Sequence, residues 1–119
     1  MKVPKIFDSE YKFCLILWEN EPINSTKLTA LCKEKLGWSK ATTYTNIRRL
    51  CERGVIKNEN TIVSSIISKE QAQQAQLEQL MEKTFEDSTP AFLAAFCKSR
   101  KLTKADVDQL EALIREYKE

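Results

Sequence analysis

The sequence predicts a mainly α-helical fold class with a small β-hairpin, and three observations lead to this prediction. Apolar residues recur at helical spacing in three short segments before Gly54. The stretch from Gly54 to Ser68 is instead rich in β-branched residues, as strands are. Helical spacing returns in residues 69–119. Three short helices followed by a hairpin predict an N-terminal winged helix-turn-helix domain over residues 1–68, and residues 69–119 then form a C-terminal helical dimerisation domain.

Length and composition fit a small folded protein. The chain has 119 residues, of which 42% are hydrophobic and 30% charged, so it can bury one core. No apolar stretch approaches the ~20 residues that cross a bilayer, and no signal-peptide core follows Lys5. We therefore expect a cytoplasmic protein that has no membrane as a partner.

The cysteines favour buried thiols over a metal site. Cys14, Cys32, Cys51 and Cys97 form no C-x-x-C pair, and the chain has no histidine. The first three lie on the apolar side of predicted helices, as reduced, buried cysteines do. We expect neither a metal nor a cofactor.

The first two helices are predicted from apolar spacing and end signals. A helix from Asp8 to about Asn20 has Asp8 placed to cap it. Its residues at helical spacing are Phe7, Tyr11, Cys14, Leu15 and Trp18. The second helix starts with Asn24 or Ser25 as its cap and stops at Gly37 in a left-handed conformation. Its inward residues are Leu28, Leu31, Cys32 and Leu36.

The third helix carries two opposed faces with different chemistry. It follows Trp38, is capped by Ser39 and ends at Gly54. Its apolar side holds Thr43, Ile47, Leu50 and Cys51. The opposite side holds hydroxyl, amide and guanidinium groups of the size that reaches base edges and phosphates in a DNA major groove. The candidate DNA-binding residues are Ser39, Lys40, Thr42, Thr45, Asn46, Arg48, Arg49 and Arg53. The alternative is an ordinary solvated helix face.

Charge is unevenly distributed along the chain. Residues 1–68 hold 11 Lys or Arg against 7 Asp or Glu, whereas residues 69–119 hold 8 against 10. The segment with the candidate recognition helix is therefore the basic one. This imbalance agrees with nucleic-acid binding, although solvated surfaces often differ by as much.

A β-hairpin is predicted after Gly54. Val55 to Lys57 form its first strand, Asn58 to Asn60 its turn, and Thr61 to Ile67 its second strand. In a winged helix the tip of this hairpin usually lies over the DNA backbone. The tip here has no Lys or Arg, which favours the alternative that the hairpin only closes the core.

The remaining residues predict three amphipathic helices. Ser68 and Gln71 form a capping box for the first, Ser88-Thr89-Pro90 begins the second, and Thr103 begins the third. A second copy of the chain is the economical way to cover three apolar stripes, and packing against the first helix is the alternative. The candidate dimerisation residues are Leu77, Leu80, Met81, Phe85, Phe92, Leu93, Phe96, Val107, Leu110, Leu113, Ile114 and Tyr117.

These motifs together resemble the penicillinase repressor (BlaI/MecI-type) family of bacterial transcription regulators. Three motifs match: IFDSEY at Ile6 to Tyr11, LWE at Leu17 to Glu19, and LTKADVDQLEAL at Leu102 to Leu113. In the third helix the matching residues are Trp38-Ser39, Thr42, Thr45, Ile47, Arg49-Leu50 and Gly54. The resemblance implies a homodimeric repressor that binds a palindromic DNA operator, as regulators of β-lactam resistance genes do. It implies no catalysis.

Three features depart from the family pattern. Lys40-Ala41 stands where the family usually has proline and lysine, so the first turn of the helix is expected to read different bases. The segment from Gly54 to Ser68 is shorter than usual and lacks an aromatic, basic hairpin. Members of the resistance type are cleaved by a regulatory protease between Asn and Phe, and the matching pair here is Ala95-Phe96. Copper-responsive relatives carry a C-x-C pair near the end, which this chain lacks. A sensor, a protease and an inducing signal thus stay unassigned.

The residues bear on three classes of function. A DNA-binding transcriptional repressor is favoured, because Arg48, Arg49 and Arg53 have only Glu52 among them and suit a polyanion. The alternative is a winged-helix protein–protein interaction module that docks the same face on another protein. An enzyme is not expected, since the sequence has no histidine, only two glycines and no carboxylate pair in an apolar setting.

Overall fold

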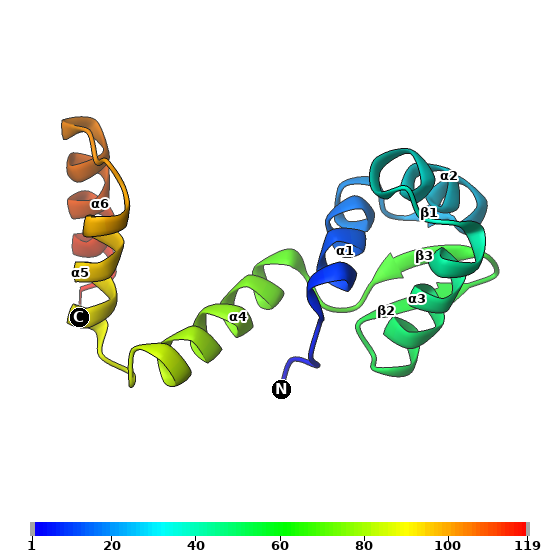
Figure 1. The fold of residues 1–119 in the computed structure, drawn as a ribbon, viewed down its shortest axis with the longest axis horizontal. Coiled ribbons are helices and arrows are strands. Elements are labelled where there is room, and N and C mark those ends of the chain that lie inside the picture. The colour runs from blue at the N-terminus through cyan, green and yellow to red at the C-terminus, as the bar shows by residue number, and fades with distance from the viewer. Residues whose placement is uncertain (1, 119) are drawn as a thin grey trace. The chain divides into compact units, whose positions relative to one another are not determined.

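The computed structural model describes residues 2–118, and these form six helices and three short strands (Figure 1). The helices are α1 (Asp8–Asn20), α2 (Ser25–Leu36), α3 (Lys40–Glu52), α4 (Lys69–Thr84), α5 (Thr89–Ser99) and α6 (Lys104–Glu116). The strands are β1 (Ile23–Asn24), β2 (Ile56–Glu59) and β3 (Ile62–Ser65). The fold class is as predicted: a winged helix followed by further helices.

The chain divides into two compact units, Met1–Leu77 and Glu78–Glu119. The sequence placed a boundary at residue 68, where the capping box of α4 begins. In the structure the boundary falls further along the sequence, inside α4, because the first turns of that helix belong to the first unit. Ala72 is buried there, and Trp18 Nε1 donates a hydrogen bond to the Ile67 carbonyl oxygen at 3.0 Å.

The ends of α2 and α3 follow the sequence signals. Asn24 caps α2, because its side-chain oxygen accepts a hydrogen bond from the Thr26 amide at 2.8 Å. Gly37 ends α2 with a φ of 69°, a left-handed conformation that glycine adopts without steric cost. Ser39 then caps α3, and its hydroxyl oxygen accepts from the Thr42 amide at 3.1 Å. The predicted helix-turn-helix is thereby confirmed.

The buried face of α1 differs from the predicted one. Its buried residues are Glu10, Phe13, Cys14, Ile16 and Leu17. Phe7, expected on the inner face, precedes the helix and is about half exposed. Asp8 begins the helix and does not cap it; instead Glu10 Oε1 accepts a hydrogen bond from the Phe7 amide at 2.9 Å. Almost every residue from Tyr11 to Trp18 is apolar, so spacing alone does not determine which side is buried.

The sheet has one strand more than predicted. β1 was expected to be a plain interruption between two helices, but it pairs antiparallel with β3, and the strand order is β1-β3-β2. Ile23 lies opposite Val63, and Asn24 lies opposite Ile62. A two-residue strand has too little pattern to be recognised without its partner.

The hairpin turn is also displaced from its predicted place. β2 extends to Glu59, which pairs with Ile62, so the loop consists of Asn60 and Thr61 alone. Both have positive φ angles, 52° and 67°, as a type I′ turn requires. The sequence favoured Asn58 to Asn60 because asparagine is common in turns, but β2 continues through Asn58 and Glu59, and only Asn60 of the three lies in the loop.

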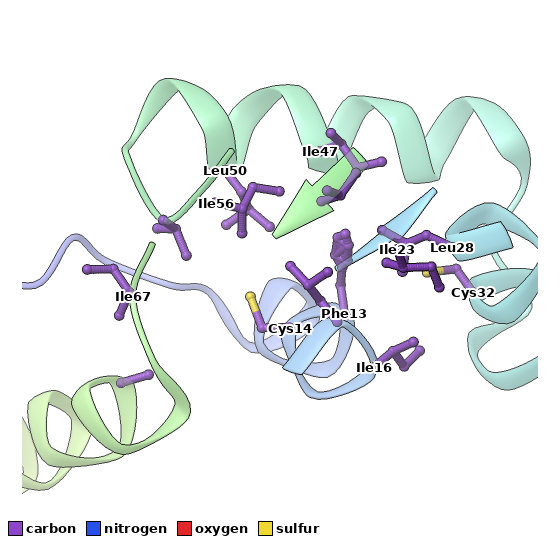
Figure 2. Packing of buried hydrophobic residues seen from close by; sticks show 14 residues of the cluster. Phe13, Cys14, Ile16, Ile23, Leu28, Cys32, Ile47, Leu50, Ile56 and Ile67 are labelled. Carbon is purple, nitrogen blue, oxygen red and sulfur yellow. The ribbon is translucent and has the colours of Figure 1, made fainter. Parts of the chain in front are cut away.

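One hydrophobic core holds the first unit together. In Figure 2, Ile47 and Leu50 of α3 point toward Ile56 of the hairpin and toward Phe13 of α1. The core also includes Val55, Val63, Leu28 and Cys32, all fully or almost fully buried. Burial raises the pKa of the Cys14 thiol to about 12, with a smaller contribution from the Glu10 carboxylate. Cys14 and Cys32 are thus buried free thiols, as expected, and Cys51 is partly buried.

The second unit shows the predicted helix starts. Ser88 caps α5 by accepting from the Ala91 amide at 3.2 Å, and Pro90 lies in the first turn. Thr103 and Asp106 form a capping box at the start of α6. The hydrogen bonds from Thr103 hold the pKa of the Asp106 carboxyl below its usual value.

The turn at Asn60-Thr61 generates a prediction about stability. A β-branched residue with positive φ is strained, and glycine is the preferred second residue of a type I′ turn. We expect Thr61→Gly to raise the free energy of unfolding by ~0.5 to 1 kcal/mol in urea titrations. Thr61→Ala is the matched control: it also removes the hydroxyl but keeps the strain. Equal stability of the two variants would contradict this explanation.

Candidate nucleic-acid interface

α3 has the two faces that its sequence predicted. Thr43, Ile47 and Leu50 are buried, and Thr43 also donates its hydroxyl to the Ser39 carbonyl oxygen at 3.0 Å. The opposite side is open: Thr42 and Arg49 are exposed, and the residues between them along the same face are partly exposed. Packing of the inner side therefore fixes which side chains of α3 can meet a ligand.

A contact between α2 and α3 fixes the angle between the two helices of the helix-turn-helix. The Tyr44 hydroxyl donates to Ser25 Oγ, 3.3 Å away, at the start of α2. The Ser25 hydroxyl can also donate a hydrogen bond to the ionised Tyr44 oxygen, and this lowers the pKa of the Tyr44 phenol. Lys40 lies above the same ring, with its Nζ 5.9 Å from the ring centre. Tyr44 and Ser25 were not among the predicted site residues, although Tyr44 lies on α3 beside Thr45.

Two predicted contact residues make local hydrogen bonds at the start of α3. The Ser39 hydroxyl is engaged with both the amide and the hydroxyl of Thr42, so its first role is to cap the helix. Asn46 donates its side-chain amide to the Thr42 carbonyl oxygen at 2.9 Å. This bond uses one of the two N–H donors of the Asn46 side chain, and a bidentate contact to adenine would use the other donor and the side-chain oxygen.

The cations of α3 differ in how strongly they are engaged. Arg48 lies 3.9 Å from Glu52 one turn later, and both side chains are about two-thirds exposed, so this pair is weak and opens easily. Among residues 2–118, Arg49 has no carboxylate within 4.0 Å of its guanidinium. Arg49 is thus the arginine of α3 that is most available to a phosphate or a guanine.

Arg53 lies in a different environment from the one predicted. Its guanidinium forms an ion pair with the buried Glu10 carboxylate of α1 and donates to the Lys5 carbonyl oxygen at 3.0 Å. It also lies over the Phe7 ring, 5.2 Å from its centre. About a quarter of the side chain remains exposed. We therefore leave Arg53 out of the proposed DNA contacts.

The partners of Arg53 were missed by sequence reasoning, although one signal was present. Glu10, Cys14 and Leu17 recur at i, i+4 and i+7, which places a carboxylate on the buried side of α1. A buried carboxylate requires a cation or several hydrogen bonds. That reasoning predicts a partner for Glu10, but only the fold identifies it as Arg53.

The hairpin is held against the helices instead of extending freely. Glu21 accepts hydrogen bonds from the Ser65 amide at 2.7 Å and from the Ser65 hydroxyl at 2.8 Å. At the tip, the Ser25 amide donates to the Thr61 carbonyl oxygen at 2.8 Å. Lys57 is the hairpin's cation and lies 3.7 Å from Glu59. These contacts support the alternative that the hairpin mainly closes the core.

Neither a metal-binding cluster nor a membrane-spanning helix is found in the part of the chain that the structure describes. Residues 2–118 contain no group of three or more Cys, Asp or Glu side chains arranged to hold a metal ion. No helix within that range is long and apolar enough to span a membrane.

Comparison with known families connects this geometry to a biological class. The model of the penicillinase repressor family matches residues 6–116, which covers both units. The chain belongs to the penicillinase repressor family. A search of curated proteins found no match.

Membership in the penicillinase repressor family makes the chain a DNA-binding transcriptional repressor, and members of the family are regulators, not enzymes. The predicted resemblance is confirmed over nearly the whole chain, including the helices of the second unit. In this family of repressors the exposed side of α3 is the natural candidate for the DNA-binding surface.

The capping role of Ser39 can be tested separately from DNA binding. Ser39→Ala removes the acceptor of the Thr42 amide and should lower the free energy of unfolding by ~1 kcal/mol. Ser39→Asp supplies another good cap and should retain the stability of the parent protein. Urea titrations measure both. If alanine and aspartate were equivalent, Ser39 would not act as a cap.

Proposed function

We propose that this repressor acts as a homodimer on a palindromic operator, with one α3 helix in the major groove of each half-site. The exposed face of α3 carries the proposal. It combines small hydroxyl and amide groups with an available arginine, while its other face is anchored in the core. A repressor seated in this way would block access of the transcription machinery to a promoter.

The proposed contacts divide by chemistry. Thr42 and Thr45 offer methyl groups for thymine and hydroxyls for base edges, and Asn46 offers an amide for adenine. Arg49 suits either a guanine or a phosphate, and Lys40 and Arg48 suit phosphates. Ser39 positions the first turn of the helix. The hairpin contributes stability more than contacts, because its tip has neither Lys nor Arg.

Dimerisation is proposed because the second unit lacks an interior. No side chain of α5 or α6 is buried, although both helices carry apolar stripes. Phe85, Phe92 and Phe96 pack on one another, with centroid distances of 5.5 and 6.3 Å between successive rings. The exposed large apolar side chains of the second unit are Leu80, Leu93, Val107, Leu113, Ile114 and Tyr117, and Leu77 at the end of the first unit is also exposed. Met81 and Leu110 are partly buried.

A second copy of the chain suits this surface best. Exposed apolar patches of this kind mark interfaces, and two-fold pairing is the commonest symmetry of homo-oligomers. A two-fold dimer presents two identical α3 helices, and such a dimer reads an inverted repeat. The palindromic operator therefore follows from the proposed dimer.

DNA recognition by α3 can be tested with two substitutions after selection of a preferred duplex from random sequences. Thr45→Ala should cost ~1 to 3 kcal/mol on the preferred site and little on unrelated duplexes. Arg49→Ala should weaken binding and, where it contacts a phosphate, reduce the slope of log affinity against log salt by about 1. Fluorescence anisotropy across a salt series measures both effects.

The matched control for these variants is Lys12→Ala, which removes one positive charge from the exposed side of α1. It should change affinity only slightly on every duplex. If selection enriched no sequence, or if Thr45→Ala bound all duplexes as the parent does, the interaction-module alternative would replace DNA recognition by this face.

The proposed dimer is tested by placing charges on the apolar surface of the second unit. Leu80 and Leu113 are 42% and 50% exposed, so Leu80→Glu and Leu113→Glu should leave each helix folded while preventing association. Analytical ultracentrifugation should show a dimer for the parent and a monomer for the double variant.

Gln79→Glu and Gln109→Glu add the same charges at exposed polar positions of α4 and α6, and this control protein should remain dimeric. A parent protein that is monomeric at tens of micromolar would have a dimer affinity weaker than about 6 to 7 kcal/mol, which would contradict the proposal.

A further inference from the structure

A buried carboxylate of α1 lies against the end of the recognition helix. Glu10 is 4% exposed, and both of its oxygens are used: Oε1 accepts from the Phe7 amide and Oε2 from Arg53. Arg53 directly follows the last residue of α3. The ion pair therefore joins two helices at the point where α3 ends.

The Arg53 guanidinium is held by more than its ion pair. Its Nη1 donates to the Lys5 carbonyl oxygen at 3.0 Å, and its Nε lies 3.4 Å from the Arg49 carbonyl oxygen. The Phe7 ring has the Arg53 guanidinium 5.2 Å from its centre and the Lys5 ammonium 4.6 Å from it. These contacts use all three guanidinium nitrogens and connect the segment before α1 to the end of α3.

We propose that Glu10 and Arg53 form a lock that sets the orientation of α3, so that Arg53 serves DNA recognition as a positioning residue and not as a phosphate contact. The inference rests on the proposed DNA recognition by α3. Its basis is geometric: the start of α3 is fixed by Ser39 and by Tyr44 on Ser25, and the lock fixes the other end.

The competing role for Arg53 is a contact with a DNA phosphate. For that contact the guanidinium would have to leave Glu10, and a buried carboxylate would remain without its cation. Arg49 lies one turn earlier and has no such partner among the described residues. The two roles also predict opposite changes in DNA affinity for one substitution.

Glu10→Gln is that substitution. If Arg53 were a phosphate contact, removing the carboxylate would free it, and DNA affinity would rise with a steeper salt dependence. In the lock, Glu10→Gln weakens the restraint on α3, and affinity for the preferred duplex falls by about tenfold, within the range for residues coupled in one network. Glu19→Gln, an exposed position of α1, makes the same charge change and serves as the matched control.

Arg53→Lys gives a second, independent test of the lock. A lysine retains the charge and binds phosphate well, but it cannot make the several directed contacts of a guanidinium. The lock predicts that Arg53→Lys loses about as much affinity as Glu10→Gln, and that the double variant loses no more than either alone. Binding is compared at a temperature where circular dichroism shows every variant fully folded, so that a loss of stability alone does not change it.

Hydrogen exchange without DNA separates failure of the lock from failure of the proposed function. Glu10→Gln and Arg53→Lys should speed amide exchange in residues 49–55, whereas Glu19→Gln should not. This result supports the lock even if no duplex binds, in which case the DNA proposal alone has failed. Unchanged exchange, tighter DNA binding by Glu10→Gln, or parental binding by Arg53→Lys would each overturn the lock.

Discussion

Burial of one side of α3 is the constraint from which the proposed function follows. Thr43, Ile47 and Leu50 are buried, and the last two belong to the hydrophobic core of the first unit, so the helix cannot rotate about its axis without exposing them. The side chains of the opposite face are consequently exposed to solvent in fixed positions. Capping by Ser39 and the contact of Tyr44 with Ser25 add to this restraint at the start of α3. A rigid, one-sided helix is what readout of base edges requires, because base contacts depend on position within fractions of an ångström.

The small size of the first unit explains why its hairpin resembles a structural element more than a DNA-binding wing. Val55, Ile56 and Val63 are needed to close a core to which three short helices and Ala72 of α4 contribute. β1, Glu21 and the amide of Ser25 then hold the hairpin against the helices. A hairpin restrained along its length, with Lys57 beside Glu59, has little freedom and little charge to follow a phosphate backbone. Sequence recognition is therefore concentrated on α3.

Local signals in the sequence were sufficient for most of the fold but not for all of the site. Gly37, Ser39 and the alternation of polar and apolar residues in α3 act within a few positions, so the end of α2, the start of α3 and the buried side of α3 were predicted correctly. In α1 nearly all residues are apolar between Tyr11 and Trp18, and such a run has no preferred side. β1 and the pairing of Arg53 with Glu10 depend on segments far apart in sequence, and no local pattern contains that information. The partner of Arg53 accordingly follows only from the fold, which brings the end of α3 beside α1.

The charge available on one α3 helix suggests why a single copy would make a poor repressor. Of its cations, Arg48 faces Glu52 and Arg53 is engaged by Glu10, which leaves Lys40 and Arg49 most available. Each phosphate contact contributes a modest, salt-dependent gain, so two or three of them hold a protein only weakly at physiological salt. Joining two copies makes the second binding event intramolecular and multiplies affinity without any new contact on α3. On this reasoning, the exposed apolar residues of the second unit matter to DNA binding as directly as the polar face of α3 does, since occupancy of an operator would depend on both.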